Sequence, residues 1–454
     1  MKTLAQELSE YAQALQPRDL PADVIQQAKR LIIDTIGCAI GGYASEPGTI
    51  ARDLAADFGS GRLRATIIGS GQTASPDLAA FVNGVMIRYL DYNDGYTSTT
   101  SGHPSDNIAA VLSSAEAAGA DGMRVIAATV LAYEMYCRFS DALDTLPFDH
   151  STLDCIASSL SSAYLFRLPP EQMANALNLA ITPNLALHQP RIDILSHWKA
   201  CAAANACRNA VFATMLAARG LTGPRFAFEG AEGLFKVLSK NPVELAPLGG
   251  SGRPYKIMEC SIKRFPLGQY SQTVIQAVLE VRAQLPDVTD IAEVHIRTMQ
   301  KAITIMAGDP QKWRPTTRET ADHSMVYTTG VALMYGSVHQ RHFNDEFLHN
   351  PELLDLVSRV KVSPSAEADR RAPEAMLCDV EVLTRSGKRY SAEVAYHKGH
   401  YKNPISDAAL EEKFRSLAND VIAPSQVDRL LDRLWHLEDA QDIGDILRLT
   451  LIKD

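Results

Sequence analysis

A histidine, His103, lies close in sequence to the acids Asp91 and Asp94 in the segment 91–107, which reads DYNDGYTSTTSGHPSDN. An apolar run over 108–112 follows, and Ser105 or Asp106 can cap a helix that begins there. We therefore expect His103 to lie just ahead of a helix N-terminus, where free N–H groups favour anions and an imidazole stays neutral. A neutral histidine beside a carboxylate-binding helix end can remove a proton from a polycarboxylate.

Two lysines elsewhere in the chain have the positive charge that such a reaction needs. Lys199 follows Trp198 at the head of an alanine-rich apolar helix. There it is either a snorkelling side chain or a buried ammonium whose anionic partner is a substrate. Lys263 lies where the helical pattern ends, and it is either surface charge or part of a clamp for carboxylates. Because ligand sites favour seams between domains, this position favours the clamp.

His150 and Tyr327 are further candidates, and each has a structural alternative. His150 lies at a predicted helix start, as His103 does, but a single histidine there more often makes a structural hydrogen bond. Tyr327 opens a predicted helix and is, on its own, more simply explained as a tyrosine on a half-buried helix face. Metal ligation is a third option for the histidines, but no HxH, HExxH or CxxC spacing supports a zinc site.

The composition narrows the class of protein. The 454 residues are 46% hydrophobic and 21% charged, as in soluble globular proteins of two or three domains. A net charge of -9 gives no general attraction to nucleic acid or to an anionic membrane, and no apolar run reaches the ~18 residues of a membrane span. Glycine motifs for nucleotide cofactors and a GxSxG nucleophile motif are absent, and the cysteines predict reduced core thiols in a cytoplasmic protein.

Helical periodicity predicts that the first 260 or so residues are all-helical. The predicted helices of the chain run over residues 4–15, 21–42, 48–58, 76–90, 105–118, 122–140, 150–165, 170–182, 196–219, 407–418 and 424–450. Alternating apolar positions predict strands at 291–297, 378–382 and 390–396. The last two are joined by a turn at 385–388 into an antiparallel pair.

The fold class that follows is mainly α with an α+β part. We expect a large all-helical domain built from both chain ends, residues 1–266 and 400–454, and a smaller α+β domain over 267–399. The last helices are expected to pack back on the first domain. The polar stretch 363–373, which contains two prolines, is the best candidate for a flexible loop.

Taken in order, these motifs resemble those of the MmgE/PrpD family along nearly the whole chain. The matching blocks include LDYND at 90–94, GHPSDN at 102–107, HWK at 197–199, KRFP at 263–266 and DHS at 322–324. The resemblance implies that the α+β domain acts as a lid and that the protein is a homodimer. It also implies a lyase without a metal or other cofactor, which dehydrates a 2-hydroxy di- or tricarboxylate in the manner of 2-methylcitrate dehydratase.

Carried over by position, the resemblance places seven residues of this chain at the site, and Tyr270, at a position where relatives commonly have histidine, is added as the eighth. Catalytic are His103, His150, Lys199 and Tyr327, and substrate-binding are Asp91, Asp94, Lys263 and Tyr270. We expect His103, oriented by Asp91 or Asp94, to take the proton next to a carboxylate. The lysines are expected to hold carboxylates, while His150 or Tyr327 protonates the leaving hydroxyl.

Three alternatives to dehydration stay open. Decarboxylation of a cis-aconitate-like acid and epimerisation of a dicarboxylate reuse the same groups, and a catalytically silent paralogue would only bind a carboxylate. The chain also departs from the family pattern, with Gly95 where relatives commonly have threonine and Tyr270 where they commonly have histidine. Because a hydroxyl and a titratable cation are lost, we expect a substrate with fewer or differently placed carboxylates.

Overall fold

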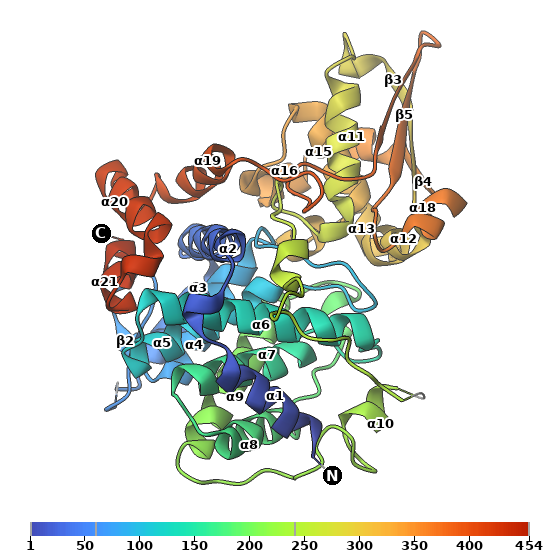
Figure 1. The fold of residues 1–454 in the computed structure, drawn as a ribbon. Helices are drawn as coiled ribbons and strands as arrows, with labels where there is room; N and C mark the ends of the chain where they lie inside the picture. Colours follow the sequence, from blue (N-terminus) through green and yellow to red (C-terminus); the bar gives the residue numbers. More distant parts are fainter. Residues whose placement is uncertain (1, 60, 240–241, 453–454) are drawn as a thin grey trace.

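The computed structural model describes residues 2–59, 61–239 and 242–452. Figure 1 shows two parts, which we call the helical body and the α+β body. Among the described residues, no helix combines the length and the apolar character needed to cross a membrane. All seven cysteines are buried and free, as predicted for core thiols.

Each body has its own apolar core. The buried core residues of the helical body come from 5–262 and, after a long interruption, from 405–447. Those of the α+β body come from 265–394. The fold is therefore mainly α with an α+β part, as the sequence predicts. The domain limits at 266 and 400 stay a prediction.

The helical body begins with a series of amphipathic and buried helices. These are α1 (Leu4–Ala14), α2 (Ala22–Gly41), α3 (Glu46–Ala56), α4 (Pro76–Tyr89), α5 (Ile108–Ala118), α6 (Gly122–Ala142), α7 (Thr152–Leu165), α8 (Pro170–Ile181), α9 (Trp198–Ala217) and α10 (Leu234–Leu238). Small residues let α4 and α9 approach closely, since a Cβ added to Gly84 would lie 2.9 Å from that of Ala204. A short hairpin of β1 (Ala65–Thr66) and β2 (Thr73–Ala74) shows that this part is not all-helical.

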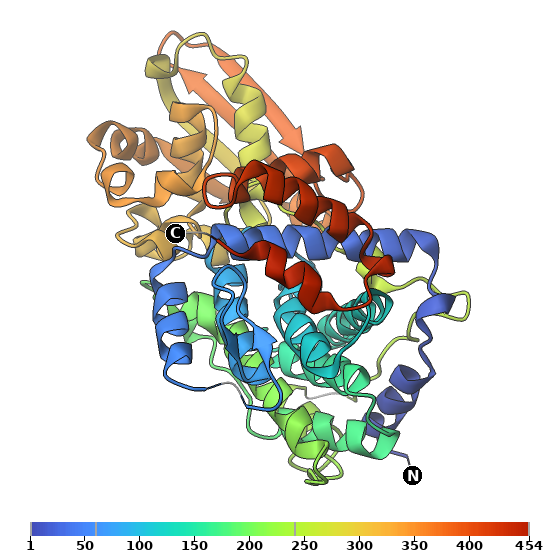
Figure 2. The ribbon, with the colours of Figure 1, turned by 90° about the vertical axis from the view of Figure 1, so that its left-hand side faces the viewer.

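The last helices return to the helical body (Figure 2), where the first two of them pack on α2 and the third packs on α5. They are α19 (Asp407–Ala418), α20 (Pro424–Trp435) and α21 (Ile443–Leu447). The contact is tight, because a Cβ on Gly37 would lie 2.9 Å from the ring of Phe414. The prediction of one helix over 424–450 is wrong. Asp442 begins a new helix by accepting a hydrogen bond from the Gly444 N–H at 2.9 Å.

The α+β body is built on a four-stranded sheet with the strand order β4-β3-β5-β6. Its strands are β3 (Ile291–Thr298), β4 (Val360–Pro364), β5 (Cys378–Thr384) and β6 (Arg389–Val394). The predicted antiparallel pair of β5 and β6 is confirmed, but β4 runs parallel to β3, so the sheet is mixed. The expected flexible loop at 363–373 is wrong, because β4 occupies its start and Ser365 caps α18 (Ala366–Arg371) by accepting from the Ala368 N–H at 3.3 Å.

Further helices of the α+β body accompany this sheet, and Figure 1 shows α11 and α15 on one side of it. They are α11 (Gln272–Arg282), α12 (Gln300–Ala307), α13 (Pro310–Trp313), α14 (Arg318–Ala321), α15 (Met325–Tyr335), α16 (Asp345–Leu348) and α17 (Pro351–Ser358). α11 packs on β5 and β6 and also on α15. Two short stretches near the helical body carry site residues, the segment before α11 and the turn between α14 and α15.

Candidate active site

Three basic side chains converge on one buried carboxylate, that of Asp91. Arg88 Nη1 donates to Asp91 Oδ1 at 2.7 Å, while Lys263 Nζ bonds the same carboxylate and, at 3.0 Å, the Asp91 backbone carbonyl. Lys199 Nζ lies 3.4 Å from Asp91 Oδ2. Burial alone raises the pKa of Asp91, but Arg88, Lys263 and Lys199 outweigh it and hold the pKa well below its usual range. Asp91 is therefore a permanent anion among three cations.

The backbone explains why these groups meet. Arg88 lies in the last turn of α4, and Asp91 follows the helix with a φ of 48°, in the left-handed region that aspartate tolerates better than most residues. The Asp91 N–H donates to the Arg88 carbonyl at 3.2 Å. Lys199 lies in the first turn of α9, and Lys263 lies on the connection between the two bodies. The cluster thus forms where helix ends and a connection come together.

Asp322 and His323 extend the cluster from the α+β body. Lys199 Nζ donates to Asp322 Oδ1 at 2.5 Å. His323 Nδ1 lies 2.8 Å from Asp322 Oδ1 and 3.0 Å from Asp91 Oδ2. Burial, with Lys199 nearby, lowers the pKa of His323 to about 4. The anionic partners of Lys199 in this structure are therefore Asp322 and Asp91, and the cluster joins the two bodies.

Arg88, Asp322 and His323 are not among the residues that the sequence predicts for the site. Arg88 could have been recognised as a candidate, because it lies on a buried turn of an apolar helix. Basic residues in such places are rarely found unpaired. A signal for the other two is their position directly before Ser324, which caps α15. We call the group Arg88, Asp91, Lys199, Lys263, Asp322 and His323 the charge cluster.

His103 faces the charge cluster with one ring nitrogen. Its Nδ1 lies 2.6 Å from the backbone carbonyl of Asp94. Because a carbonyl only accepts, Nδ1 carries the proton and Nε2 carries the lone pair. Nε2 accepts from Arg88 Nη2 at 2.9 Å. Burial, with Arg88 and Lys263 nearby, holds the pKa of His103 well below its ordinary value of 6.5, so the ring is a neutral base.

The turn after His103 differs from the predicted helix start. Residues 104–107 form a 3-10 turn, and no side-chain bond caps α5 behind it. The prediction that Ser105 or Asp106 caps this helix is wrong, because both side chains bond back to residues 93–94. They thereby fix the backbone carbonyl that holds the ring of His103.

His150 lies beside His103, with ring centroids 5.6 Å apart in an edge-to-face arrangement. Its Nδ1 is 3.2 Å from the Tyr136 hydroxyl. Burial lowers the pKa of His150 to about 3, so this ring is also neutral. The neighbouring Asp149 accepts two bonds from Arg191, at 2.7 and 3.1 Å, and these tie the start of α7 to the loop before α9.

The other three predicted residues lie in different surroundings. Asp94 Oδ1 accepts from Ser105 Oγ at 2.6 Å, and burial raises the pKa of Asp94 to about 6. The Tyr270 hydroxyl donates to Ser101 Oγ at 2.9 Å, which links the two bodies. The buried Tyr327 hydroxyl donates to the His342 carbonyl at 2.6 Å and, within the described part of the chain, bonds no member of the charge cluster. The structure thus gathers Asp91, His103, Lys199 and Lys263, while the roles of all eight residues stay predictions.

Two sets of donor atoms are close enough together to hold a cation. The sets are Asp91, Asp322 and His323, and Asp106, His150 and Asp154, with ligand atoms within 4.8 Å of one another. In the first set, arginine and lysine side chains already neutralise the carboxylates, so a divalent ion would add positive charge to a group rich in it. In the second, burial raises the pKa of Asp106 to about 7 and also raises that of Asp154, which favours protonated carboxyls over anionic ligands. We assign no metal ligands among these residues.

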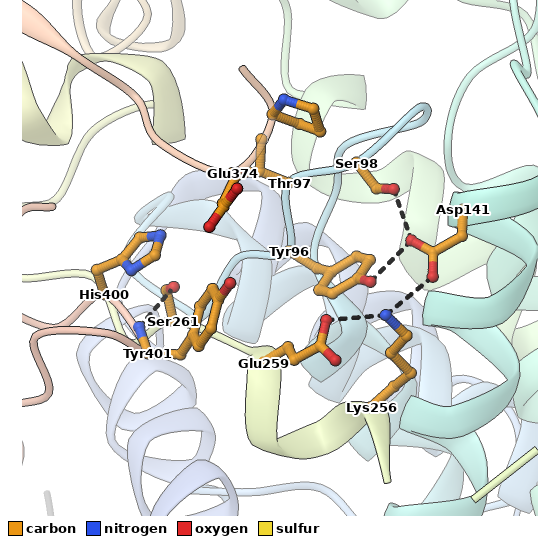
Figure 3. A pocket seen from close by; sticks show the side chains of 11 residues that line it. Tyr96, Thr97, Ser98, Asp141, Lys256, Glu259, Ser261, Glu374, His400 and Tyr401 are labelled. Carbon is orange, nitrogen blue, oxygen red and sulfur yellow. Dashed lines mark hydrogen bonds and ion pairs between the residues drawn. The ribbon is translucent and has the colours of Figure 1, made fainter. Parts of the chain in front are cut away.

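A polar hollow of about 220 Å³ lies apart from the charge cluster (Figure 3). Its charged groups are already paired, since Asp141 accepts from the Tyr96 hydroxyl at 2.8 Å and lies 3.1 Å from Lys256 Nζ. No member of the charge cluster lines it. The charge cluster with His103, and not this hollow, has a neutral base beside convergent cations.

The two domain models of one known protein family match the two bodies of the molecule. The model of the MmgE/PrpD N-terminal domain matches residues 6–246, and that of the MmgE/PrpD C-terminal domain matches residues 265–437. The chain belongs to the MmgE/PrpD family. The resemblance predicted from the sequence motifs is thereby confirmed.

Individual relatives in the MmgE/PrpD family match nearly the whole chain. A human cis-aconitate decarboxylase is 24% identical over 469 residues, covering 100% of this chain and 95% of the relative. A 2-methylcitrate dehydratase of Cupriavidus necator is 26% identical over 446 residues, covering 89% and 88%, and one of Salmonella typhimurium is 26% identical over 442 residues, covering 88% and 87%. Membership in the MmgE/PrpD family alone therefore does not choose between dehydration and decarboxylation.

Proposed function

We propose that this MmgE/PrpD protein is a lyase that dehydrates a 2-hydroxy di- or tricarboxylate without a metal or other cofactor. The observation that carries the proposal is the position of His103 Nε2, whose lone pair accepts from Arg88 at 2.9 Å and lies 3.9 Å from Asp91 Oδ1. Arg88, Lys199 and Lys263 converge on that same carboxylate. A base that takes a proton from carbon next to a carboxylate creates enolate-like charge, and fixed cations stabilise that charge most strongly in a dry site.

The resting contacts suggest how a substrate starts the reaction. Arg88 donates to His103 Nε2, so the base is occupied while Arg88 points toward it. A substrate carboxylate that binds Arg88 draws the guanidinium away and frees the lone pair. Lys199 and Lys263 then hold the carboxylate whose adjacent carbon loses its proton.

Dehydration also needs an acid, because the hydroxyl leaves as water. His150 lies near enough to His103 to share the substrate, whereas the Tyr327 hydroxyl is engaged with a backbone carbonyl. His150 is neutral, however, whereas Lys263 carries a proton that it can release near neutral pH. Burial lowers the pKa of Lys263 to about 8 against the opposing effect of Asp91. We therefore add Lys263 to the candidate acids.

A panel of acids tests this function. The purified protein is incubated in D2O with citrate, 2-methylcitrate, malate and their unsaturated counterparts, and products are followed by NMR. We expect reversible loss or addition of water. Release of CO2 would instead favour the decarboxylase alternative, to which the cis-aconitate decarboxylase relatives point. Deuterium exchange without net change would favour an epimerase, and binding without turnover a silent carboxylate-binding protein.

The pH dependence of kcat/KM is expected to show a basic limb from Lys263. Its ammonium is lost as pH rises through about 8, so kcat/KM falls above that pH and is level just below it. His103 adds no acidic limb near neutrality, because its pKa lies well below 6.5. In Lys263→Arg the guanidinium stays charged, so the basic limb disappears.

The matched control for this pH profile is Lys361→Arg, because Lys361 is exposed on β4 and should keep the wild-type profile. An unchanged basic limb in Lys263→Arg would assign the titration to another group. If kcat also falls in Lys263→Arg, the size of that fall measures how much Lys263 contributes as an acid.

We also propose that the protein is a homodimer. Four large apolar side chains stand exposed in one segment, Leu187 (70%), Ile192 (39%), Ile194 (54%) and Trp198 (49%). Exposed apolar surface of this kind is typical of an interface. Light scattering should give twice the chain mass of 49.5 kDa, and Ile194→Asp should shift the protein toward one chain. A wild-type mass of one chain would contradict the proposal.

A further inference from the structure

Gln269 has a buried side-chain amide without a partner. The residue begins the 3-10 turn Gln269–Ser271 of the α+β body and is 7% exposed. Within the described part of the chain, neither its Oε1 nor its Nε2 makes a hydrogen bond. Because buried polar groups are nearly always paired, an amide with both atoms unpaired indicates a partner that comes from outside the chain.

Gly95 determines where this amide lies. A Cβ on Gly95 would be 2.3 Å from Oε1 and 3.0 Å from Nε2 of Gln269, so the missing side chain leaves the space that the amide fills. The Gly95 backbone cannot be its partner, since its N–H and carbonyl bond Ser261 at 2.8 and 2.9 Å. The amide therefore rests against a peptide that has no free hydrogen-bonding group.

Gly95 follows the peptide that holds the ring of His103. The peptide between Asp94 and Gly95 contains the carbonyl that holds His103 Nδ1 at 2.6 Å. On the other side of Gln269, the Tyr270 hydroxyl reaches Ser101 Oγ at 2.9 Å across the seam between the two bodies. An outside partner of the amide would thus lie next to the peptide that holds the ring of His103.

We propose that Gln269 is a specificity-determining residue whose amide binds a hydroxyl group of the substrate. The amide is uncharged and offers one donor side and one acceptor side, and a hydroxyl both accepts and donates, so it satisfies both unpaired atoms. The cations of the charge cluster, and not Gln269, serve the carboxylates. This inference rests on the proposed function and adds to it the group that recognises the hydroxyl.

Two acids that differ by one hydroxyl test the inference. Citrate and tricarballylate have the same three carboxylates, and only citrate has a hydroxyl on the central carbon. Calorimetric titration of the wild type should give a Kd for citrate that is lower by roughly 10-fold or more. In Gln269→Leu this preference should vanish while tricarballylate binds as in the wild type.

Further variants separate recognition from folding. Leucine is close in shape and removes both unpaired polar atoms, so Gln269→Leu should keep or raise Tm, whereas a structural amide would lower it. Gly95→Ala should displace the flexible amide and also weaken the citrate preference. Gln284→Leu, on the exposed surface of the same body, is the matched control and should keep the preference.

Three results of these titrations would contradict the inference, and the third would also contradict the proposed function. A citrate preference that survives in Gln269→Leu overturns the inference and leaves the proposed function intact. A wild type that binds citrate and tricarballylate equally also overturns it. A wild type that binds neither acid and turns over no acid of the panel overturns the proposed function, and the inference fails with it.

Discussion

Replacing His103 with asparagine is expected to lower kcat/KM for the acid that the wild type turns over by about 10³-fold, the usual contribution of a general base. Asparagine can still donate a hydrogen bond to the Asp94 carbonyl that now holds Nδ1, so the local turn is kept. Its amide has no basic lone pair, so it cannot take the proton from carbon. Steady-state kinetics with that acid measure the effect.

The same variant should also lose deuterium exchange at the substrate carbon, because exchange needs only the proton transfer. His349→Asn is the matched control, since His349 is exposed in the α+β body and should keep wild-type rates. A His103→Asn protein that retains both exchange and turnover within tenfold of wild type would place the base elsewhere. His323 and Lys263 would then be the residues to test, since both contact Asp91.

Several site residues could be predicted because each has a local signal. Lys199 stands beside a tryptophan at the head of an alanine-rich helix, and Lys263 stands where the helical periodicity ends. His103 directly precedes a proline, and an apolar run begins five residues after it. Such signals depend on a few neighbouring residues, so the sequence displays them without knowledge of the fold.

The arrangement around Asp91 has no such local signal. The bond between Lys199 and Asp322 joins residues 123 positions apart, and it forms only because the α+β body docks on the start of α9. The φ of 48° that turns the Asp91 carboxylate toward Arg88 is likewise unreadable from the sequence, since aspartate adopts the left-handed region only when its surroundings stabilise it. The position of Asp91 at the centre of the charge cluster therefore appears only in the structure.

The same division between local and distant contacts explains which features of the fold could be predicted and which could not. The hairpin of β5 and β6 is local, with Gly387 at a φ of 84° in its turn, and its alternating pattern predicts it. The parallel pairing of β3 with β4 needs a long crossover and leaves no short-range pattern. The break after α20 consists of a 3-10 turn at Leu437–Asp439 and the Asp442 cap of the next helix, and the apolar periodicity continues across it.

Replacing Asp91 with asparagine is expected to lower the free energy of unfolding by about 3–5 kcal/mol, the cost of leaving a buried charge without its partner. Asparagine also adopts the left-handed region readily, so the backbone at φ 48° is kept and only the charge is removed. Arg88 and Lys263 then lose a bonded carboxylate in a site that water does not screen. Thermal and urea unfolding measure the loss.

The surface pair of Asp428 with Arg415 provides the control. Its atoms are 2.6 Å apart, but Asp428 is 62% exposed, so Asp428→Asn should change stability by about 1 kcal/mol at most. Because the pKa of Asp91 is lowered on folding, its contribution is complete above the ordinary value of 3.8 and disappears only as pH falls through the lower folded value. Titration of Asp91 itself should therefore not change the difference between wild type and Asp91→Asn between about pH 5 and 7.

Citrate binding to Asp91→Asn tests whether substrate carboxylates bind at the charge cluster. In Asp91→Asn the freed cations lack their anion, so citrate should raise the Tm of the variant by more than it raises that of the wild type. Asp428→Asn should respond to citrate as the wild type does. Equal citrate effects in all three proteins would mean that the carboxylates bind away from the charge cluster. A larger effect in Asp91→Asn alone would support binding of the citrate carboxylates to the cations that Asp91 neutralises.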